Sequence, residues 1–215
     1  MPAPPSIETP TVFIVDDEES VGAALGWLFE SVHLQSRTFT SAKTFLEEFK
    51  NDFSVACLIT DLCMADMTGL ELLEEIKARG YELPVIVLTA HGDVPGAVRA
   101  MRLGAIDFVQ KPFNATGLLH TVNHALRVAR ERETRSRTVH SLRMEIACLS
   151  AREREVLFHL LEAESSKEIG RILNISYKTV DVHRATLMRK LGVASFGELM
   201  RRYRDLRDAD RQHFA

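Results

Sequence analysis

The 215-residue chain lacks any run of 18 apolar residues, so its sequence contains no candidate transmembrane helix. The first ten residues, MPAPPSIETP, lack the basic start and apolar stretch of a secretory signal, and we expect a disordered lead over 1–10. Cysteine is scarce, since only Cys57, Cys63 and Cys148 are present, without metal-ligand spacing. These features predict reduced thiols in a cytoplasmic protein that has no membrane partner.

Net charge is also small, at −3, but this average conceals a split along the chain. Residues 1–128 carry 9 basic and 17 acidic side chains, a balance of −8, whereas residues 129–215 carry 18 and 13, a balance of +5. The basic half is suited to a polyanion, although a solvated helical surface gives the same modest excess. We therefore expect the two halves to have different partners.

Short strand-like runs alternate with amphipathic helical patterns over the first half. The runs are TVFIV (11–15), LQSRTF (34–39), VACLIT (55–60), PVIVLT (84–89) and AIDFV (105–109). Continuous apolar runs such as PVIVLT are typical of parallel strands that are covered on both faces. Five strand–helix alternations predict a doubly wound five-stranded parallel α/β sheet over 11–126.

The second half has a purely helical pattern. Residues 127–146 are highly charged and predict a helical linker that continues the preceding helix. Beyond it, an all-α domain of four helices is predicted over 147–210. The four helices are expected at 151–163, 166–173, 177–191 and 195–204, with possible N-caps at Ser166, Ser176 and Ser195.

Polar residues follow the predicted strands at their carboxyl ends, where sites form in such sheets. Mutually repelling carboxylates would require a cation, and hard oxygen ligands favour Mg²⁺. A lysine and a hydroxyl nearby can hold phosphate oxygens, so the set predicts phosphoryl transfer. A single aspartate after a strand is more often a cap or turn residue, but the combination is not expected by chance. The set comprises Asp16, Asp17, Asp61, Thr89 and Lys111.

The segments VFIVDDEES, LITDLCMADMTGLELL and PVIVLTAHGDVPGAVRAMRLGAIDFVQKPF resemble a response regulator of the FixJ/NarL class, with a CheY-like receiver domain. The resemblance implies that Asp61 is the phosphoacceptor. It also implies that Asp17, Asp61 and the Cys63 carbonyl ligate Mg²⁺, with Asp16 acting largely through water.

The same resemblance assigns the phosphate-binding and switch residues. Thr89 and Lys111 would hold the phosphoryl group, and Phe108 would be the aromatic switch residue. The Lys111–Pro112 bond would be cis. This chain departs from the family pattern at Ala65, where proline usually follows the methionine. The loop residues His91 and Asp93 favour a mobile-loop role over a metal or acid–base role.

The tail resembles a LuxR-type helix-turn-helix in SAREREVL, SKEIGRIL, TVDVHR and KLGV. One face of 176–190 is apolar and the other is polar, as a recognition helix requires, although a solvated bundle shares this pattern. The resemblance implies a DNA-backbone contact from Lys167 and groove contacts from the helix. The full predicted DNA-binding set is Lys167, Lys178, Thr179, Val180, His183, Arg184 and Lys190.

The combined pattern predicts a transcription regulator that is controlled by phosphorylation. A sensor histidine kinase would phosphorylate Asp61, and the phosphorylated chain would form a homodimer on promoter DNA. As an enzyme, the chain would only accept and slowly hydrolyse its own aspartyl phosphate. One alternative is a constitutive DNA binder with a degenerate receiver. Another is a Mg²⁺-dependent phosphohydrolase, which would need a second acid where Cys63 stands.

Overall fold

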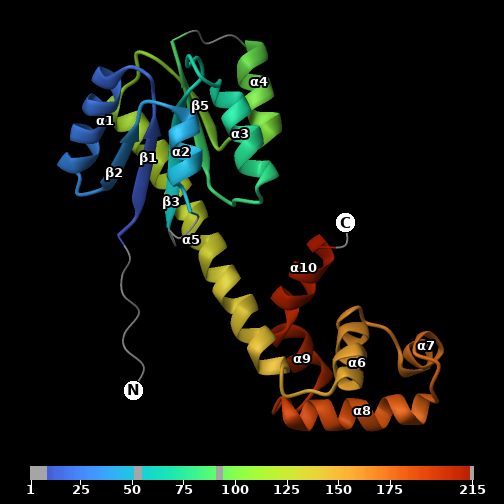
Figure 1. The fold of residues 1–215 in the computed structure, drawn as a ribbon. Helices are drawn as coiled ribbons and strands as arrows, with labels where there is room; N and C mark the ends of the chain where they lie inside the picture. Colours follow the sequence, from blue (N-terminus) through green and yellow to red (C-terminus); the bar gives the residue numbers. More distant parts are fainter. Residues whose placement is uncertain (1–8, 51–54, 91–93, 214–215) are drawn as a thin grey trace. The chain divides into compact units, whose positions relative to one another are not determined.

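The computed structural model describes residues 9–50, 55–90 and 94–213, and the chain divides into two compact units, Met1–Glu133 and Thr134–Ala215 (Figure 1). The expected disordered lead lies mostly outside the described residues, as do His91 and Asp93.

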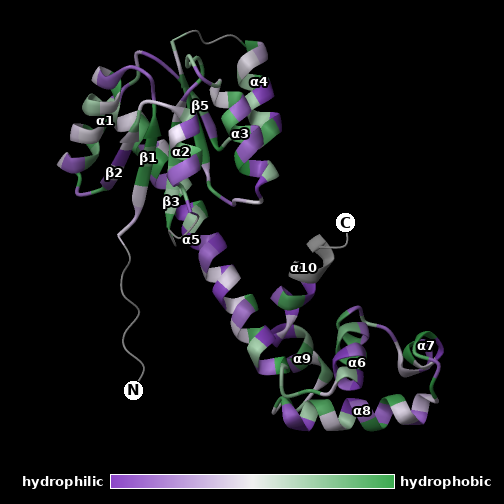
Figure 2. Ribbon diagram, in the orientation of Figure 1, coloured by the Kyte–Doolittle hydropathy of each residue, from purple (hydrophilic) through white to green (hydrophobic). Residues whose placement is uncertain are grey.

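The first unit contains the predicted five-stranded parallel sheet, in the order β2-β1-β3-β4-β5. The predicted runs lie within two residues of the observed strands. The sheet edge β2 is mainly polar and exposed, in contrast to β1 (Figure 2). The strands are β1 (Thr11–Val15), β2 (Gln35–Phe39), β3 (Ala56–Asp61), β4 (Val85–Thr89) and β5 (Asp107–Gln110).

Five helices cover the sheet and place one hydrophobic core on each side. Alternate residues of β1 enter opposite cores, because successive strand side chains point to opposite faces. Phe13 packs with α2 and α3, whereas Ile14 packs with α1 and α5. The helices are α1 (Glu19–Ser31), α2 (Ala42–Glu48), α3 (Gly69–Ala78), α4 (Val94–Leu103) and α5 (Ala115–Ile146). The predicted fold class of this unit is confirmed.

The helix α5 is continuous over 32 residues, and the predicted linker 127–146 forms its later part. Its first turns contribute Leu118 and Val122 to the first unit, and its last turns contribute Leu142 and Ile146 to the core of the second. The charged composition therefore concealed that the last turns of this segment belong to a core.

The second unit contains the four predicted helices and one more that the pattern did not predict. The extra helix α10 has few apolar residues, although Leu206 is fully buried. Each predicted helix has a serine N-cap, but the cap of α7 is Ser165, so the expectation of Ser166 was wrong by one residue. The helices are α6 (Ala151–Leu161), α7 (Ser166–Ile172), α8 (Tyr177–Lys190), α9 (Phe196–Arg202) and α10 (Arg204–His213).

Gly170 has a steric function that its helix propensity does not reveal. A β-carbon at this position would lie 2.8 Å from the carbonyl oxygen of Ile175, in the turn between α7 and α8. The sequence suggests that glycine merely loosens α7 relative to alanine. In the structure, glycine is what allows α7 to approach this turn closely.

Ala163, which follows α6, has a φ of 61° in the left-handed region. Residues with a β-carbon are strained there, so Ala163→Gly should stabilise the second unit by about 1 kcal/mol. Gly192, with a φ of 64° and open space around it, is the matched control. Gly192→Ala should destabilise by a similar amount. Chemical denaturation followed by far-ultraviolet circular dichroism tests both, and equal signs for the two changes would refute the strain argument.

Candidate functional site

A lysine joins two aspartates at the carboxyl edge of the sheet. Asp16 follows β1, Asp61 ends β3 and Lys111 follows β5. The Lys111 Nζ atom lies 2.7 Å from Asp16 Oδ2 and 2.7 Å from Asp61 Oδ1. The parallel topology thus brings together three residues that are far apart in the sequence.

Both carboxylates are almost inaccessible, at 1% exposed for Asp16 and 8% for Asp61, and backbone donors satisfy their other oxygens. The Glu18 N–H donates to Asp16 Oδ1 at 3.0 Å, and the Cys63 N–H donates to Asp61 Oδ2 at 2.7 Å. Burial by itself would lower the pKa of Lys111, but hydrogen bonds and the charges of the two aspartates outweigh burial and raise it. Lys111 is therefore held as a cation between the acids.

Asp17 is exposed, and it contacts the loop that follows β3. Its Oδ2 atom accepts a hydrogen bond from the Ala65 N–H at 3.2 Å. Farther along the same loop, Asp66 accepts hydrogen bonds from the Ser41 hydroxyl at 2.8 Å and the Lys43 N–H at 3.0 Å. Partial burial opposes a lower pKa for Asp66, but these hydrogen bonds lower it. No pattern in the sequence predicts that Asp66 joins this loop to the start of α2.

Gly69, the first residue of α3, lies against the backbone of the predicted phosphoacceptor. A β-carbon there would come within 2.2 Å of the Asp61 carbonyl oxygen. The Gly69 N–H donates to the Leu62 carbonyl at 2.9 Å. Glycine therefore closes the loop tightly behind Asp61, which sequence inspection could have suggested from a glycine at a helix start.

The remaining predicted switch residues lie on the adjoining strands. Thr89 ends β4 and is buried, and its carbonyl accepts a hydrogen bond from the Lys111 N–H at 2.7 Å. Phe108 on β5 is partly buried against the core that contains α3 and α4. The peptide bond between Lys111 and Pro112 is cis, as the resemblance implies.

The acidic residues are chemically suited to Mg²⁺, because they supply carboxylate oxygens beside a backbone carbonyl. In the described parts of the chain, no three acidic, histidine or cysteine side chains form a ready cluster for a metal. The Lys111 ammonium lies between Asp16 and Asp61. Binding of the cation beside Asp61 would therefore require the Lys111 ammonium to move away from that carboxylate.

In the second unit, α7, a turn at Asn174 and α8 form the predicted helix-turn-helix. Asn174 has a φ of 52°. Val180 is 0% exposed within the core of this unit, so the expected groove contact by its side chain is wrong. Leu187 is the other buried residue of α8, and it packs into the same core as Val180.

The other predicted DNA-binding residues differ in their surroundings. Lys178 and Thr179 are exposed on α8, and Lys167 is exposed on α7. His183 is partly buried, and so is Arg184, whose guanidinium lies 5.2 Å from the centre of the Phe196 ring. Lys190 donates to the buried Glu153 at 2.7 Å, which gives it a structural contact within the unit.

Residues outside the predicted set share the exposed face of α8. Val182 is 64% exposed, and Ala185 and Arg189 are also exposed. With Lys178, they form one stripe opposite Val180, because residues three or four apart lie on the same side of a helix. We call Lys178, Val182, Ala185 and Arg189 the outer stripe of α8. A helical-wheel projection of the sequence, oriented by the buried leucines, would have identified this stripe.

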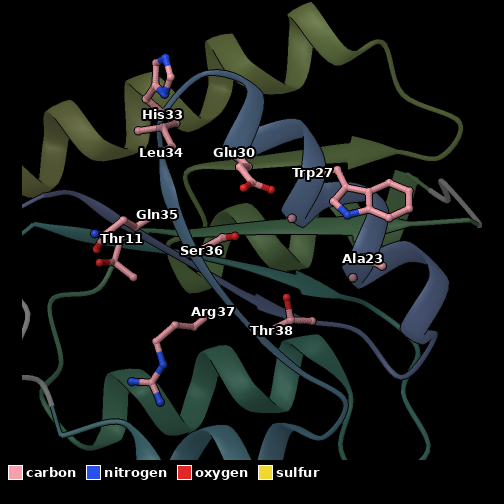
Figure 3. A pocket seen from close by; sticks show the side chains of 12 residues that line it. Thr11, Ala23, Trp27, Glu30, His33, Leu34, Gln35, Ser36, Arg37 and Thr38 are labelled. Atoms are coloured by element: carbon pink, nitrogen blue, oxygen red, sulfur yellow. The ribbon is translucent and has the colours of Figure 1, made fainter.

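A separate hollow of about 740 Å³ lies between α1 and the edge strand β2 (Figure 3). Trp27 borders it and is 75% exposed, and Gly22 allows α1 to approach Thr38. None of the predicted site residues lines this hollow, so it is distinct from the acidic pocket.

Comparisons with known proteins agree with both halves of this description. The model of the response regulator receiver domain matches residues 12–123, and that of the bacterial regulatory proteins of the luxR family matches 147–203. The transcriptional regulatory protein TdiR of Thauera aromatica is 43% identical over 88% of this chain and 83% of its own. FixJ of Azorhizobium caulinodans is 41% identical, with coverages of 90% and 92%.

Solved structures show the same relationship. The response regulator StyR superimposes with a TM-score of 0.70 at 38% identity, over 91% of this chain and 98% of its own. The chain therefore belongs to the response regulators, with a receiver domain and a LuxR-type DNA-binding domain. It is a two-component transcriptional regulator related to FixJ and TdiR, and not a classical enzyme. Among the described residues, no helix is long and apolar enough to span a membrane.

Glu153 joins the N-terminus of α6 to Lys190 at the end of α8. The hydrogen bonds from Lys190 and the Ser150 N–H lower the pKa of Glu153 from 4.5 to about 2. A depressed carboxyl pKa stabilises the fold above the unfolded value, and this contribution is lost as pH falls through the folded value. Glu153→Gln should therefore lower the denaturation midpoint at pH 7, with a difference that shrinks between pH 4.5 and pH 2.

Denaturation of the full chain, followed by circular dichroism, measures this difference. Glu155→Gln is the control, because Glu155 is an exposed acid of the same helix, in contrast to the buried Glu153. A Glu153→Gln deficit that stays constant down to pH 2 would exclude the ion pair as its cause.

Proposed function

We propose that this regulator is switched by phosphorylation of Asp61 by a sensor histidine kinase. The observation that carries the proposal is the Lys111 ammonium, which lies 2.7 Å from both Asp16 and Asp61 at the strand ends. A carboxylate oxygen of Asp61 would attack phosphorus while the bond between phosphorus and the kinase histidine breaks. Such transfer depends mainly on positioning and on neutralisation of charge.

The residues around Asp61 divide this work. Asp17, Asp61 and the Cys63 carbonyl would hold Mg²⁺, with Asp16 acting largely through water, and the cation would neutralise phosphoryl charge. Lys111 would release Asp61 and pair with a phosphoryl oxygen, since its pKa is raised and it stays protonated. Thr89 would hold another phosphoryl oxygen. Slow hydrolysis of the aspartyl phosphate would reset the switch.

We propose that the signal reaches the surface through Thr89 and Phe108 and favours a homodimer. The helix α4 supports this step because it carries an exposed apolar row at helical spacing. Val94 is 74% exposed, Val98 is 43% exposed and Met101 is 50% exposed. A contiguous exposed apolar surface of this kind is typical of an interaction site. Linking two DNA-binding units would then raise the effective concentration of the second on paired half-sites.

We propose that the outer stripe of α8 enters the major groove of promoter DNA. Val180 and Leu187 pack inward, which leaves Lys178, Val182 and Arg189 to face the ligand. Cationic side chains supply salt-dependent affinity for phosphates, and the apolar Val182 could contact a thymine methyl group. Lys167 borders a hollow of about 470 Å³ with Arg171 and would contact the DNA backbone.

The constitutive DNA binder with a degenerate receiver is the second candidate. Ala65 in place of the usual family proline is the observation that favours it. The complete contact set of Asp16, Asp61 and Lys111 favours a working receiver instead. A phosphohydrolase would need an acid at position 63, where Cys63 stands exposed.

Incubation with Mg²⁺ and a small phosphodonor should add one phosphoryl group to the wild-type chain and none to Asp61→Asn. The reason is that the Lys111 ammonium donates a hydrogen bond to the Asp61 carboxylate and so lies where it can pair with a phosphoryl group added there. Intact-mass measurement records the label. Asp107→Asn is the matched control. Asp107 also lies on β5, but its carboxylate accepts a hydrogen bond from the Thr121 hydroxyl and not from Lys111. Equal labelling of wild type and Asp61→Asn would sink the assignment.

Arg189→Ala should weaken binding similarly on promoter and random duplexes, and should reduce the slope of log affinity against log salt by about 1. Val182→Ala should instead reduce the preference for the promoter and leave the salt slope unchanged. Arg207→Ala, on α10, is the control for loss of a cation, because Arg207 pairs with Asp208. Titrations at several salt concentrations measure these effects. An unchanged salt slope in Arg189→Ala would place the outer stripe away from phosphates.

A further inference from the structure

The Ala65 N–H group bonds the Oδ2 atom of Asp17 at 3.2 Å and so connects the loop after β3 with the loop after β1. Proline, which the family usually has at this position, has no N–H group and could not make this bond. We propose that the backbone N–H of Ala65 is a positioning group that holds Asp17 ready for Mg²⁺. This inference rests on the proposed function, because it concerns the same cation.

The contacts of Asp17 support a positioning role. Asp17 is exposed, and among the described residues the Ala65 N–H is the one hydrogen-bond partner found for its carboxylate. Without that bond, the side chain would be free to turn into solvent. A carboxylate accepts several hydrogen bonds, so Oδ1 remains available to a metal while Oδ2 is held.

The contact also orders the second expected ligand. Cys63, whose carbonyl is the other ligand beside Asp17, lies two residues before Ala65 in the same loop. The Cys63 N–H is already bonded to Asp61 Oδ2 at 2.7 Å, and Asp66 fastens the far side of the loop to Ser41. The Ala65 contact therefore fixes Asp17 relative to this carbonyl before the cation arrives, which reduces the entropy lost on binding.

Charge favours the same outcome. Asp17 is close in sequence to Asp16, and the pair Asp16–Asp61 shares a single lysine between two negative charges. The partial positive charge of the Ala65 N–H attracts the Asp17 carboxylate, which would otherwise turn away from those acids. A hydrogen bond from a neutral donor to a charged acceptor is stronger than one between neutral groups.

The test measures Mg²⁺ affinity by calorimetric titration of the full chain without any phosphodonor. Ala65→Pro, which removes the N–H, should weaken binding by about three- to tenfold. Ala65→Ser keeps the N–H and should bind Mg²⁺ as the wild type does. Equal or tighter binding by Ala65→Pro would overturn the proposal, and so would a loss of affinity in Ala65→Ser equal to that in Ala65→Pro.

A second measurement does not depend on the metal or on the fold of a proline variant. Hydrogen exchange of the Ala65 amide, followed by nuclear magnetic resonance without Mg²⁺, should be faster in Asp17→Ala, which removes the acceptor of this hydrogen bond, than in the wild type. Glu18→Gln removes a neighbouring charge of the same loop and should leave this exchange rate unchanged. An Ala65 amide that exchanges equally fast in wild type and Asp17→Ala would overturn the proposal.

The two proposals fail separately. A chain whose Mg²⁺ affinity falls in Ala65→Pro, but whose wild type takes no phosphoryl label on Asp61, would overturn the proposed function and keep the positioning role. A chain that is labelled on Asp61, with Ala65→Pro unaffected in Mg²⁺ affinity, would keep the proposed function and overturn the positioning role.

Discussion

The ammonium of Lys111 between Asp16 and Asp61 is the interaction on which the first unit depends for its chemistry. Two carboxylates this deeply buried repel one another and lose hydration, so they require a cation nearby. This cation is Lys111, which follows β5, the edge strand beyond β4. Its two ion pairs connect the carboxyl ends of β1, β3 and β5. A charge added at Asp61 would therefore alter contacts on three strands at once.

The sequence was sufficient for the sheet and for most of the acidic pocket, because both follow from strong local patterns. Continuous apolar runs identify buried parallel strands, and the carboxyl ends of such strands converge wherever the fold is doubly wound. Asp16, Asp61 and Lys111 could thus be placed together before any geometry was known. The contacts of Asp66 and Gly69 could not, since they depend on how one loop closes against its neighbours.

The DNA-binding unit was less predictable, because helical phase decides which side chains face out. A segment resemblance named Val180 as a contact, yet packing against α6 and α7 buries it and turns Val182 outward. Similarly, the sequence alone suggests that Lys190 belongs to a basic surface, but in the structure Lys190 forms an ion pair with the buried Glu153. The charged residues around 134–146 likewise hid Leu142 and Ile146, which complete the core of this unit. The composition of a segment describes all of its residues together, whereas only the residues on one side of the helix are buried.

The continuous helix α5 has a thermodynamic consequence. Its first turns are stabilised by one core and its last turns by the other, while its middle is polar. Helix propagation is cooperative, so each anchored end lowers the cost of keeping the middle helical. Melting of either core would remove one anchor and shorten the helix from that end. Each core is therefore completed by residues from a different end of the same helix.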